Sequence, residues 1–282
     1  MPLELSVVGK PQEAVTHTYT WKDTVLYALG IGAKKDELDF LYEGRGPKVY
    51  PSFAVVPSFS AMFQALLGCQ GNLAMVVHGG EKVVVHKPFA AAGTVKTVAT
   101  VRGIYDMRKF ANVVVEMETK DEKGELVCTT SAKILFRGEG GFGGDPAPKE
   151  PSEIAVPKDR SADFRVEEAT TAEQALLYRL SGDVNPLHAD PDFATMAGFA
   201  QGPILHGLCT YGYMVRHVAK AVCGGDATKI TGFEAQFRKP VWPGDTLVTE
   251  GWKLAPGKVA LTVGVKDKPD AVITNAWATV KE

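Results

Sequence analysis

The sequence has 282 residues, a length that allows one or two domains. Hydrophobic residues make up 45% and charged residues 23% of the chain, which provides for a packed core and excludes a disordered or collagen-like protein. Lys and Arg number 31 against 33 Asp and Glu, so the net charge of -2 gives no general attraction to nucleic acid or to an anionic membrane surface. We therefore expect neither nucleic acid nor membrane as a partner.

The cysteines indicate the compartment. Cys69, Cys128, Cys209 and Cys223 form no Cys-x-x-Cys pair and lack the density of a disulfide scaffold, so we expect reduced thiols and an intracellular protein. The first residues do not read as a secretion signal, and the last residues are not a Ser-Lys-Leu peroxisomal signal. This favours the cytoplasm and leaves a peroxisomal location open by another route.

The predicted elements occur twice, in the same order. The first half predicts a short amphipathic helix over residues 21–29, an apolar helix over 62–67 and strands over 95–101, 111–117 and 126–136. The second half predicts a short helix over 171–180, a buried helix over 208–222 and strands over 247–252, 259–265 and 271–280. Landmarks such as Tyr27 and Tyr178 recur at a nearly constant offset, which indicates diverged copies.

The stretch between the copies, residues 138–160, is rich in Gly, Pro and charge and is typical of a linker. We predict an N-terminal domain over 1–145, a Pro-rich linker over 146–160 and a C-terminal domain over 161–282. Each copy predicts an α+β fold, an antiparallel sheet around one central helix, and the two sheets could join into one extended sheet. Gly138, Gly140 and Gly143 match a dinucleotide-binding spacing, but the prolines that follow do not start the helix such a loop needs, which favours the linker.

The segment 178–207 concentrates residues that a reactive site needs. Asp183 and His188 flank Asn185-Pro186, so both side chains project from a tight turn. A carboxylate beside an imidazole is an acid/base pair near neutral pH, and Asn185 can orient a water. The alternative is that Asp183 caps the turn and His188 satisfies a backbone group. Because the first copy makes the equivalent turn with Gly30 and neither residue, we favour the functional interpretation.

Two further patterns bear on chemistry. His206-Gly207 opens the buried helix of the second copy, where free N–H groups and the helix dipole suit a developing oxyanion. The histidines His17, His78 and His86 show no metal-ligand spacing, so we expect no metal site.

At these residues the sequence resembles the MaoC-like (R)-specific enoyl-CoA hydratases, specifically the two-hot-dog hydratase 2 type also found as a domain of the peroxisomal multifunctional enzyme. The resemblance is carried by residues 181–191, Phe193-Ala194 and 203–208, and extends to 27–32, Lys87-Pro88, 140–144 and 238–240. It implies a double hot-dog fold in which the second domain carries the motif and the first makes room for the acyl chain.

The resemblance also implies an activity, the reversible hydration of trans-2-enoyl-CoA to (3R)-3-hydroxyacyl-CoA in fatty acid metabolism. Asp183 and His188 would hold the catalytic water, with either one as base, Asn185 would position it, and the backbone N–H of Gly207 would polarise the thioester carbonyl. No metal or redox cofactor is implied, since coenzyme A belongs to the substrate. Supporting and substrate-binding roles fall on Tyr178, Asp190 and His206, and on Arg238 and Lys239, which could meet CoA phosphates or simply end a strand.

Three rival functions stay open. The first is a dehydratase acting on carrier-protein thioesters, and the second is a thioesterase on the same fold, since fold does not fix function. The third is a binding module without catalysis, which an intact Asp183, Asn185 and His188 disfavours. Exposed sheet edges lead us to expect a homodimer.

Overall fold

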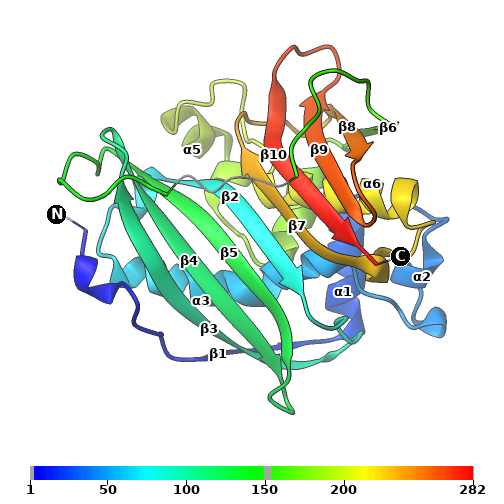
Figure 1. Ribbon diagram of the computed structural model, residues 1–282, viewed down its shortest axis with the longest axis horizontal. Helices are drawn as coiled ribbons and strands as arrows, with labels where there is room; N and C mark the ends of the chain where they lie inside the picture. The colour runs from blue at the N-terminus through cyan, green and yellow to red at the C-terminus, as the bar shows by residue number, and fades with distance from the viewer. Residues whose placement is uncertain (1–2, 149–153, 282) are drawn as a thin grey trace.

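The computed structural model describes residues 3–148 and 154–281. These residues form one ten-stranded antiparallel sheet in the order β1-β3-β4-β5-β2-β7-β10-β9-β8-β6 (Figure 1). Five strands come from the first half: β1 (Val15–Tyr19), β2 (Val76–Val85), β3 (Gly93–Asp106), β4 (Phe110–Asp121) and β5 (Leu126–Arg137). The other five are β6 (Phe164–Ala169), β7 (Ile230–Phe237), β8 (Thr246–Lys253), β9 (Lys258–Val265) and β10 (Ala271–Val280).

The two half-sheets join where β2 pairs with β7, with Glu81 opposite Ala235 and Val83 opposite Phe233. This confirms the extended sheet expected from the duplication. The six predicted strands are present, but β1, β2, β6 and β7 were missed. β1 and β6 are short strands at the two edges of the sheet, and β2 is interrupted by Gly79-Gly80, where its pairing with β5 shifts register. Such strands lack the sustained alternation on which the prediction depended.

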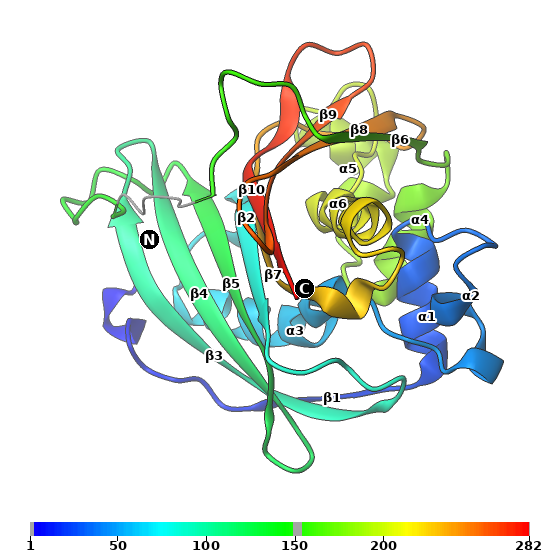
Figure 2. The ribbon, with the colours of Figure 1, turned by 45° about the vertical axis from the view of Figure 1, so that its right-hand side comes forward.

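Helix α6 (Gly207–Val222) is the central helix of the second half, and its residues from Leu208 to Ala219 are all buried. In Figure 2 it is seen nearly end-on, with β7, β10, β9, β8 and β6 curving around it, while α1 (Trp21–Gly30) and α4 (Gln174–Tyr178) lie on its other side. The predicted buried helix over 208–222 is therefore confirmed, as is the helix over 21–29. The helix predicted over 171–180 is shorter and continues as the 3₁₀ turn Arg179–Ser181.

Helix α3 (Val55–Gly68) packs on β3 and β4 through Ala61, Met62, Ala65 and Leu66. It starts earlier than predicted because Pro57 lies in its first turn, where proline is tolerated. By length and composition Pro51–Gly68 would suffice to cross a membrane, but 61% of this stretch is buried inside the fold, as in the core helix of a globular protein.

Packing crosses the predicted domain boundary. The strands respect this boundary, since β1 to β5 fall within residues 1–145 and β6 to β10 within 161–282. The core does not, because Tyr27 and Ile31 of the first half are buried in the same cluster as Tyr211 and Tyr213 of α6. Gly212 is required at this contact, since a Cβ there would collide with the Ile31 side chain. The boundary therefore divides the sheet but not the core.

Residues just before the predicted linker and at its end lie against the sheet. The Asp106 carboxylate accepts hydrogen bonds from the backbone N–H groups of Gly141 and Gly143, both at 2.8 Å, which folds the glycine-rich segment onto the turn between β3 and β4. Both glycines have positive φ, so glycine suits this arrangement. Further on, the Arg160 carbonyl accepts from Trp252 Nε1 at 3.2 Å, while part of the linker, residues 149–153, lies outside the described residues.

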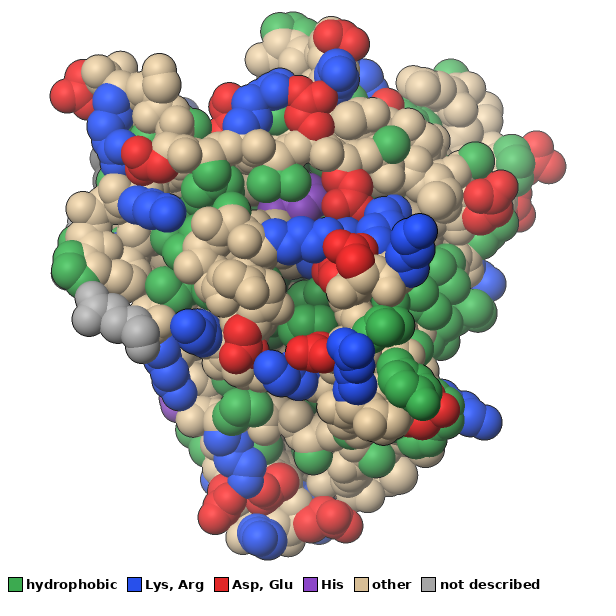
Figure 3. All heavy atoms as spheres, turned by 90° about the vertical axis from the view of Figure 1, so that its right-hand side faces the viewer, with side chains coloured by type: hydrophobic (Ala, Val, Ile, Leu, Met, Phe, Trp, Pro, Cys, Tyr) green, Lys and Arg blue, Asp and Glu red, His purple; other side chains and the backbone are tan. Residues whose placement is uncertain are grey.

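A buried ion cluster, here called the Arg216 cluster, ties the segment after α1 to α6 and β6. Its members are Glu37, Glu168, Arg216, His217 and Lys220. The Arg216 side chain is 0% exposed, and its guanidinium donates to both oxygens of Glu37 and both oxygens of Glu168 at 2.9–3.0 Å. Figure 3 faces the right-hand side of Figure 1 and shows acidic and basic side chains interspersed around a hollow with a histidine inside it.

Candidate active site

Asp183 and His188 lie in a tight turn that the local sequence dictates. Gly182 takes a φ of 131° and ends the Arg179–Ser181 turn, and Pro186 opens the 3₁₀ turn Pro186–His188. Asn185 caps that turn, since its side-chain oxygen accepts from Leu187 N at 3.0 Å. The predicted projection of both side chains from a turn is confirmed.

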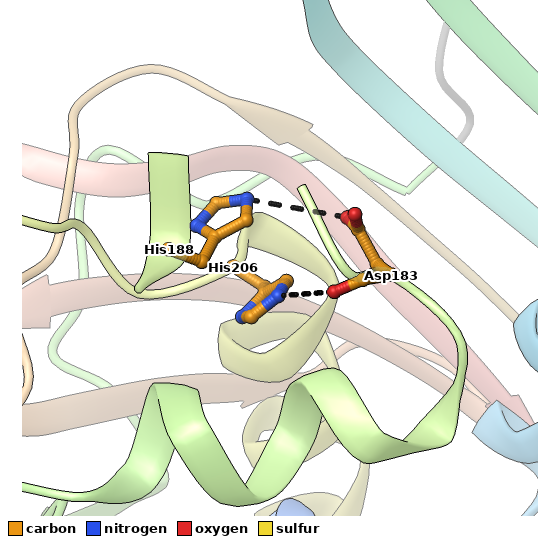
Figure 4. Close-up of side chains that lie close together, drawn as sticks. All are labelled: Asp183, His188 and His206. Carbon is orange, nitrogen blue, oxygen red and sulfur yellow. Dashed lines mark hydrogen bonds and ion pairs between the residues drawn. The ribbon is translucent and has the colours of Figure 1, made fainter. Parts of the chain in front are cut away.

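The two side chains face each other across a gap. His188 Nε2 lies 4.0 Å from Asp183 Oδ2 (Figure 4). His188 Nδ1 lies 2.8 Å from the Ile204 carbonyl, which only accepts, so Nδ1 carries the hydrogen and Nε2 presents a lone pair toward Asp183. The gap is too long for a direct hydrogen bond, but a water about 2.8 Å from each atom would bridge it. The arrangement therefore suits a held water.

His188 is more buried than its place in a turn indicated, with 8% of the residue exposed. Burial lowers its pKa from the ordinary histidine value, and the opposing effects of the Asp183 charge and the Ile204 carbonyl do not fully restore it. His188 is thus neutral at pH 7 and free to accept a proton.

His206 contacts both members of the pair. Its ring stacks on His188 with 3.6 Å between ring centroids and 25° between planes, and its Nε2 donates to the backbone carbonyl of Asp183 at 3.0 Å (Figure 4). Burial, with the charges of His188 and Arg179 adding to it, lowers the pKa of His206 to about 3. Within the described ranges its Nδ1 has no hydrogen-bond partner. His206 is therefore a neutral ring held in one tautomer.

Gly207 begins α6 next to this pair. The first N–H groups of a helix have no acceptor within the helix and lie at the positive end of its dipole, so they suit a developing oxyanion. A Cβ at Gly207 would lie 3.3 Å from the Phe237 ring, and His78 of β2 packs edge-on against the same ring at 5.3 Å. The helix end thus lies at the join between the two half-sheets.

Three further residues of the predicted site lie near the Asp183–His188 pair in the sequence. Tyr178 is buried with its ring centroid 4.9 Å from that of His206, and its support role stays a prediction. Asn185 is exposed and its oxygen is engaged as a cap, so a role in positioning water would fall to its Nδ2 and stays a prediction. The carboxylate of Asp190 caps α5 (Pro191–Met196) by accepting from Asp192 N and Phe193 N, and its support role stays a prediction.

Arg238 and Lys239 are exposed just beyond the end of β7. Arg238 Nε donates to Thr274 Oγ1 at 2.8 Å, and Lys239 Nζ lies 3.4 Å from Asp270 Oδ2. Both cations are accessible to a phosphate group, and contact with CoA stays a prediction.

The carboxylate of Asp183 and one nitrogen each of His188 and His206 lie within 4.8 Å of one another, as in some metal sites. A tetrahedral zinc ion needs in-plane lone pairs that converge on one point about 2.0–2.2 Å away. The two rings are stacked at 3.6 Å between centroids, and His206 Nε2 already donates to the Asp183 carbonyl, so it offers no lone pair to an ion beside Asp183. This geometry favours water over a metal ion between them.

One neighbouring pair was missed from the sequence. Glu81 is 3% exposed on β2, and its carboxylate lies 2.9 Å from His78 Nε2. Burial raises the pKa of Glu81, partly offset by His78. From the sequence, His78 is considered only as a metal ligand, and because β2 is not predicted, nothing in the sequence places it beside Phe237.

Comparison with known proteins covers both halves. A family model described as "MFE-2 hydratase 2 N-terminal domain" matches residues 17–138, and one described as "MaoC like domain" matches residues 153–276. The chain is 40% identical to 3-hydroxyacyl-thioester dehydratase Y of Mycobacterium tuberculosis, over 94% of this chain and 92% of that protein. It is 36% identical to the peroxisomal enoyl-CoA hydratase 2 of Arabidopsis thaliana, over 91% and 89%.

The mouse peroxisomal multifunctional enzyme type 2 is 38% identical over 97% of this chain, which spans only 38% of that longer protein. A MaoC-like dehydratase from Phytophthora capsici superimposes with a TM-score of 0.87 at 31% identity, covering 98% of both chains. A Mycobacterium tuberculosis protein described as a double hot-dog superimposes with a TM-score of 0.61 at 16% identity. The expected double hot-dog fold is thereby confirmed.

Proposed function

This chain belongs to the MaoC-like hydratase 2 family, and on that premise we propose that it catalyses the reversible hydration of trans-2-enoyl-CoA to (3R)-3-hydroxyacyl-CoA. The observation that carries the proposal is the 4.0 Å gap between Asp183 and His188 beside the N-terminus of α6. A water activator and an oxyanion site are the two devices that addition of water to a conjugated thioester needs.

The reaction divides among these groups as follows. A water in the gap gives a proton to the Nε2 lone pair of His188 while its oxygen bonds to C3 of the substrate. The electrons of the double bond move to the thioester oxygen, whose charge is stabilised by the N–H of Gly207 and the helix dipole. A proton from the Asp183–His188 pair then reaches C2 and the thioester carbonyl reforms.

No step in this scheme transfers electrons to an acceptor outside the substrate, so we propose that no redox cofactor takes part. A metal ion is likewise not needed, since the helix end polarises the carbonyl. Activity that survives dialysis against a chelator supports this, and activity restored only by an added divalent metal contradicts it.

The acyl carrier is the point on which the relatives' names differ. One is named for a 3-hydroxyacyl-thioester and another for enoyl-CoA. The accessible cations Arg238 and Lys239 support CoA, whose phosphates they could meet. A lower KM for enoyl-CoA than for the same acyl group on a carrier protein supports this assignment, and the reverse order favours the carrier-protein dehydratase.

The function is tested by adding purified protein to short and long trans-2-enoyl-CoA and measuring the absorbance of the conjugated thioester. Rapid loss of absorbance with formation of the 3R product supports the proposal. Release of free thiol instead indicates a thioesterase. Tight acyl-CoA binding with no turnover of CoA or carrier thioesters indicates a binding module.

We also propose an intracellular homodimer. The four cysteines are free and buried, as a reducing compartment allows, and the edge strands β1 and β6 offer unpaired backbone groups to a second copy. Some relatives are named as peroxisomal, so fluorescence of a tagged chain against cytoplasmic and peroxisomal markers tests the location. Size-exclusion chromatography with light scattering measures the molecular mass and so tests whether the protein is a dimer.

A further inference from the structure

We infer that His206 is a positioning residue that holds Asp183, His188 and the amide of Gly207 in one fixed arrangement. This inference rests on the function proposed above and deepens it. Three separate contacts of one side chain and its backbone carry it.

The first contact fixes the carboxylate. His206 Nε2 donates to the backbone carbonyl of Asp183 at 3.0 Å, across 23 positions of sequence. Asp183 follows Gly182, whose φ of 131° belongs to a conformation open mainly to glycine, and within its own turn its Oδ1 accepts a hydrogen bond from Asn185 N at 3.2 Å. The bond to Asn185 lies inside the turn, so the donor on His206 is what ties the Asp183 backbone to the start of α6, and its loss lets the turn shift relative to His188.

The second contact fixes the imidazole. The His206 ring covers one face of His188 at 3.6 Å between centroids and so keeps solvent from that face. The groups that face the two rings are Asp183, Arg179 and the ring of Tyr178. Since burial is the main cause of the lowered pKa of His188, the covering ring helps to keep His188 neutral.

The third contact ties the pair to the oxyanion donor. The His206 carbonyl accepts from Cys209 N at 3.1 Å and Thr210 N at 3.2 Å, which starts helix α6 at the next residue, Gly207. A shift of His206 therefore moves the helix end relative to the water-activating pair. A misplacement of about 1 Å can lower a rate by roughly 100-fold.

Two variants separate the contacts. His206→Gln keeps an amide donor for the Asp183 carbonyl but removes the stacked ring, whereas His206→Phe keeps a ring but removes the donor. His86→Gln is the matched control, because His86 is exposed and bonds only to Thr129 Oγ1 among the recorded side-chain contacts of the described chain. Each protein is measured for kcat, KM, melting temperature and the pH dependence of kcat/KM.

We expect His206→Phe to lower kcat about 10- to 100-fold with KM changed less than about threefold. The acid limb is the fall of kcat/KM at low pH, where His188 becomes protonated. In His206→Gln this limb moves to higher pH, because solvent reaches His188 and its pKa rises. In His206→Phe the limb stays near its wild-type position. A role limited to stability would lower the melting temperature without moving the limb. Unchanged kcat in His206→Phe, or an unmoved limb in His206→Gln, overturns the inference.

A second readout needs no turnover and keeps this inference separate from the proposed function. Nuclear magnetic resonance titration of the six histidine rings, with His188 assigned through His188→Asn, gives the pKa of His188 directly. A rise in that pKa in His206→Gln but not in His206→Phe supports the positioning role even if no thioester is hydrated. Equal pKa values in all three proteins contradict it even if the wild type is an active hydratase.

Discussion

Replacing Arg216 by Met should destabilise the fold, because the carboxylates of Glu37 and Glu168 would stay buried without their charged partner. The guanidinium is 0% exposed and its four hydrogen bonds satisfy Glu37 and Glu168, whose side chains are only 9% and 14% exposed. Methionine fills a similar space without charge. Removing one partner of a buried ion pair typically costs about 3–5 kcal/mol, because the remaining charge is buried without its partner.

The remaining contacts place Arg216→Met near the lower end of that range. Glu37 keeps Tyr50 Oη at 2.6 Å and Lys220 Nζ at 3.0 Å, and Glu168 keeps Lys34 Nζ at 3.3 Å. We therefore expect a loss of about 3 kcal/mol in the free energy of unfolding. For 282 residues the entropy of unfolding is about 0.6 kcal/mol per kelvin, so the melting temperature should fall by about 5 °C.

The assay is thermal unfolding at pH 7, with Arg45→Met as the matched control. Arg45 pairs with Asp39 at 3.4 Å, but both side chains are half-exposed, so its loss should change stability by about 0.5 kcal/mol or less. Adding Glu168→Gln to Arg216→Met should recover part of the loss, since an unpaired buried charge is removed. Equal melting temperatures for Arg216→Met and Arg45→Met, or no recovery in the double variant, would refute the reasoning.

The same cluster predicts an acid dependence. Burial would raise the pKa of Glu168, but its bonds to His217 and Arg216 and their charges outweigh burial and lower it to about 2. A carboxyl with a lowered folded-state pKa adds stability above its unfolded value near 4.5, and this is lost as the pH falls toward 2. The difference between wild type and Arg216→Met should therefore narrow over that window, as urea unfolding at a series of pH values would show.

Three predictions concern the active site. Asp183→Asn and His188→Asn should each lower kcat about 10²- to 10⁴-fold in the hydration assay, and His188→Asn should stay folded because its amide can still donate to the Ile204 carbonyl. Near-normal turnover in either variant removes that residue from the mechanism. The acid limb of kcat/KM should lie below the ordinary histidine pKa of 6.5, since burial lowers the pKa of His188 and its neutral form is the base; a limb above 6.5 contradicts this. Gly207→Ala should lower kcat because its Cβ meets the Phe237 ring at 3.3 Å. Adding Phe237→Leu to Gly207→Ala should restore part of the rate. If the double variant is no faster than Gly207→Ala alone, crowding against Phe237 is not the cause.

The sequence predicted those parts of the fold that have strong periodicity or restrictive residues. The helix over 208–222 and the strands over 111–117 and 259–265 repeat apolar residues at the spacing of their element, and the structure has α6, β4 and β9 there. The turn from Asp183 to His188 was predictable because proline and glycine restrict it locally.

The parts that were missed depend on contacts between distant segments. β2 pairs with β5 and with β7, which lies in the other half of the chain, and no local pattern in residues 76–85 predicts these pairings. The Arg216 cluster joins residues 37, 168 and 216, whose proximity follows only from the packing of α6 between β6 and the segment after α1. His206 was expected as a support, but its stacking on His188 depends on how two loops meet.

The first half makes the equivalent turn without the reactive pair. The first-copy turn equivalent to the Asp183 loop contains Gly30, whose carbonyl accepts from Gln174 Nε2 at 2.7 Å and from Cys209 Sγ at 3.3 Å. The next residue, Ile31, is fully buried against Gly212 of α6. A charged Asp or His at this turn would lie in an apolar core without water to act on. The turn of the first half thus packs on α6, the helix whose N-terminus we propose as the oxyanion site, and this packing helps to hold that helix in place.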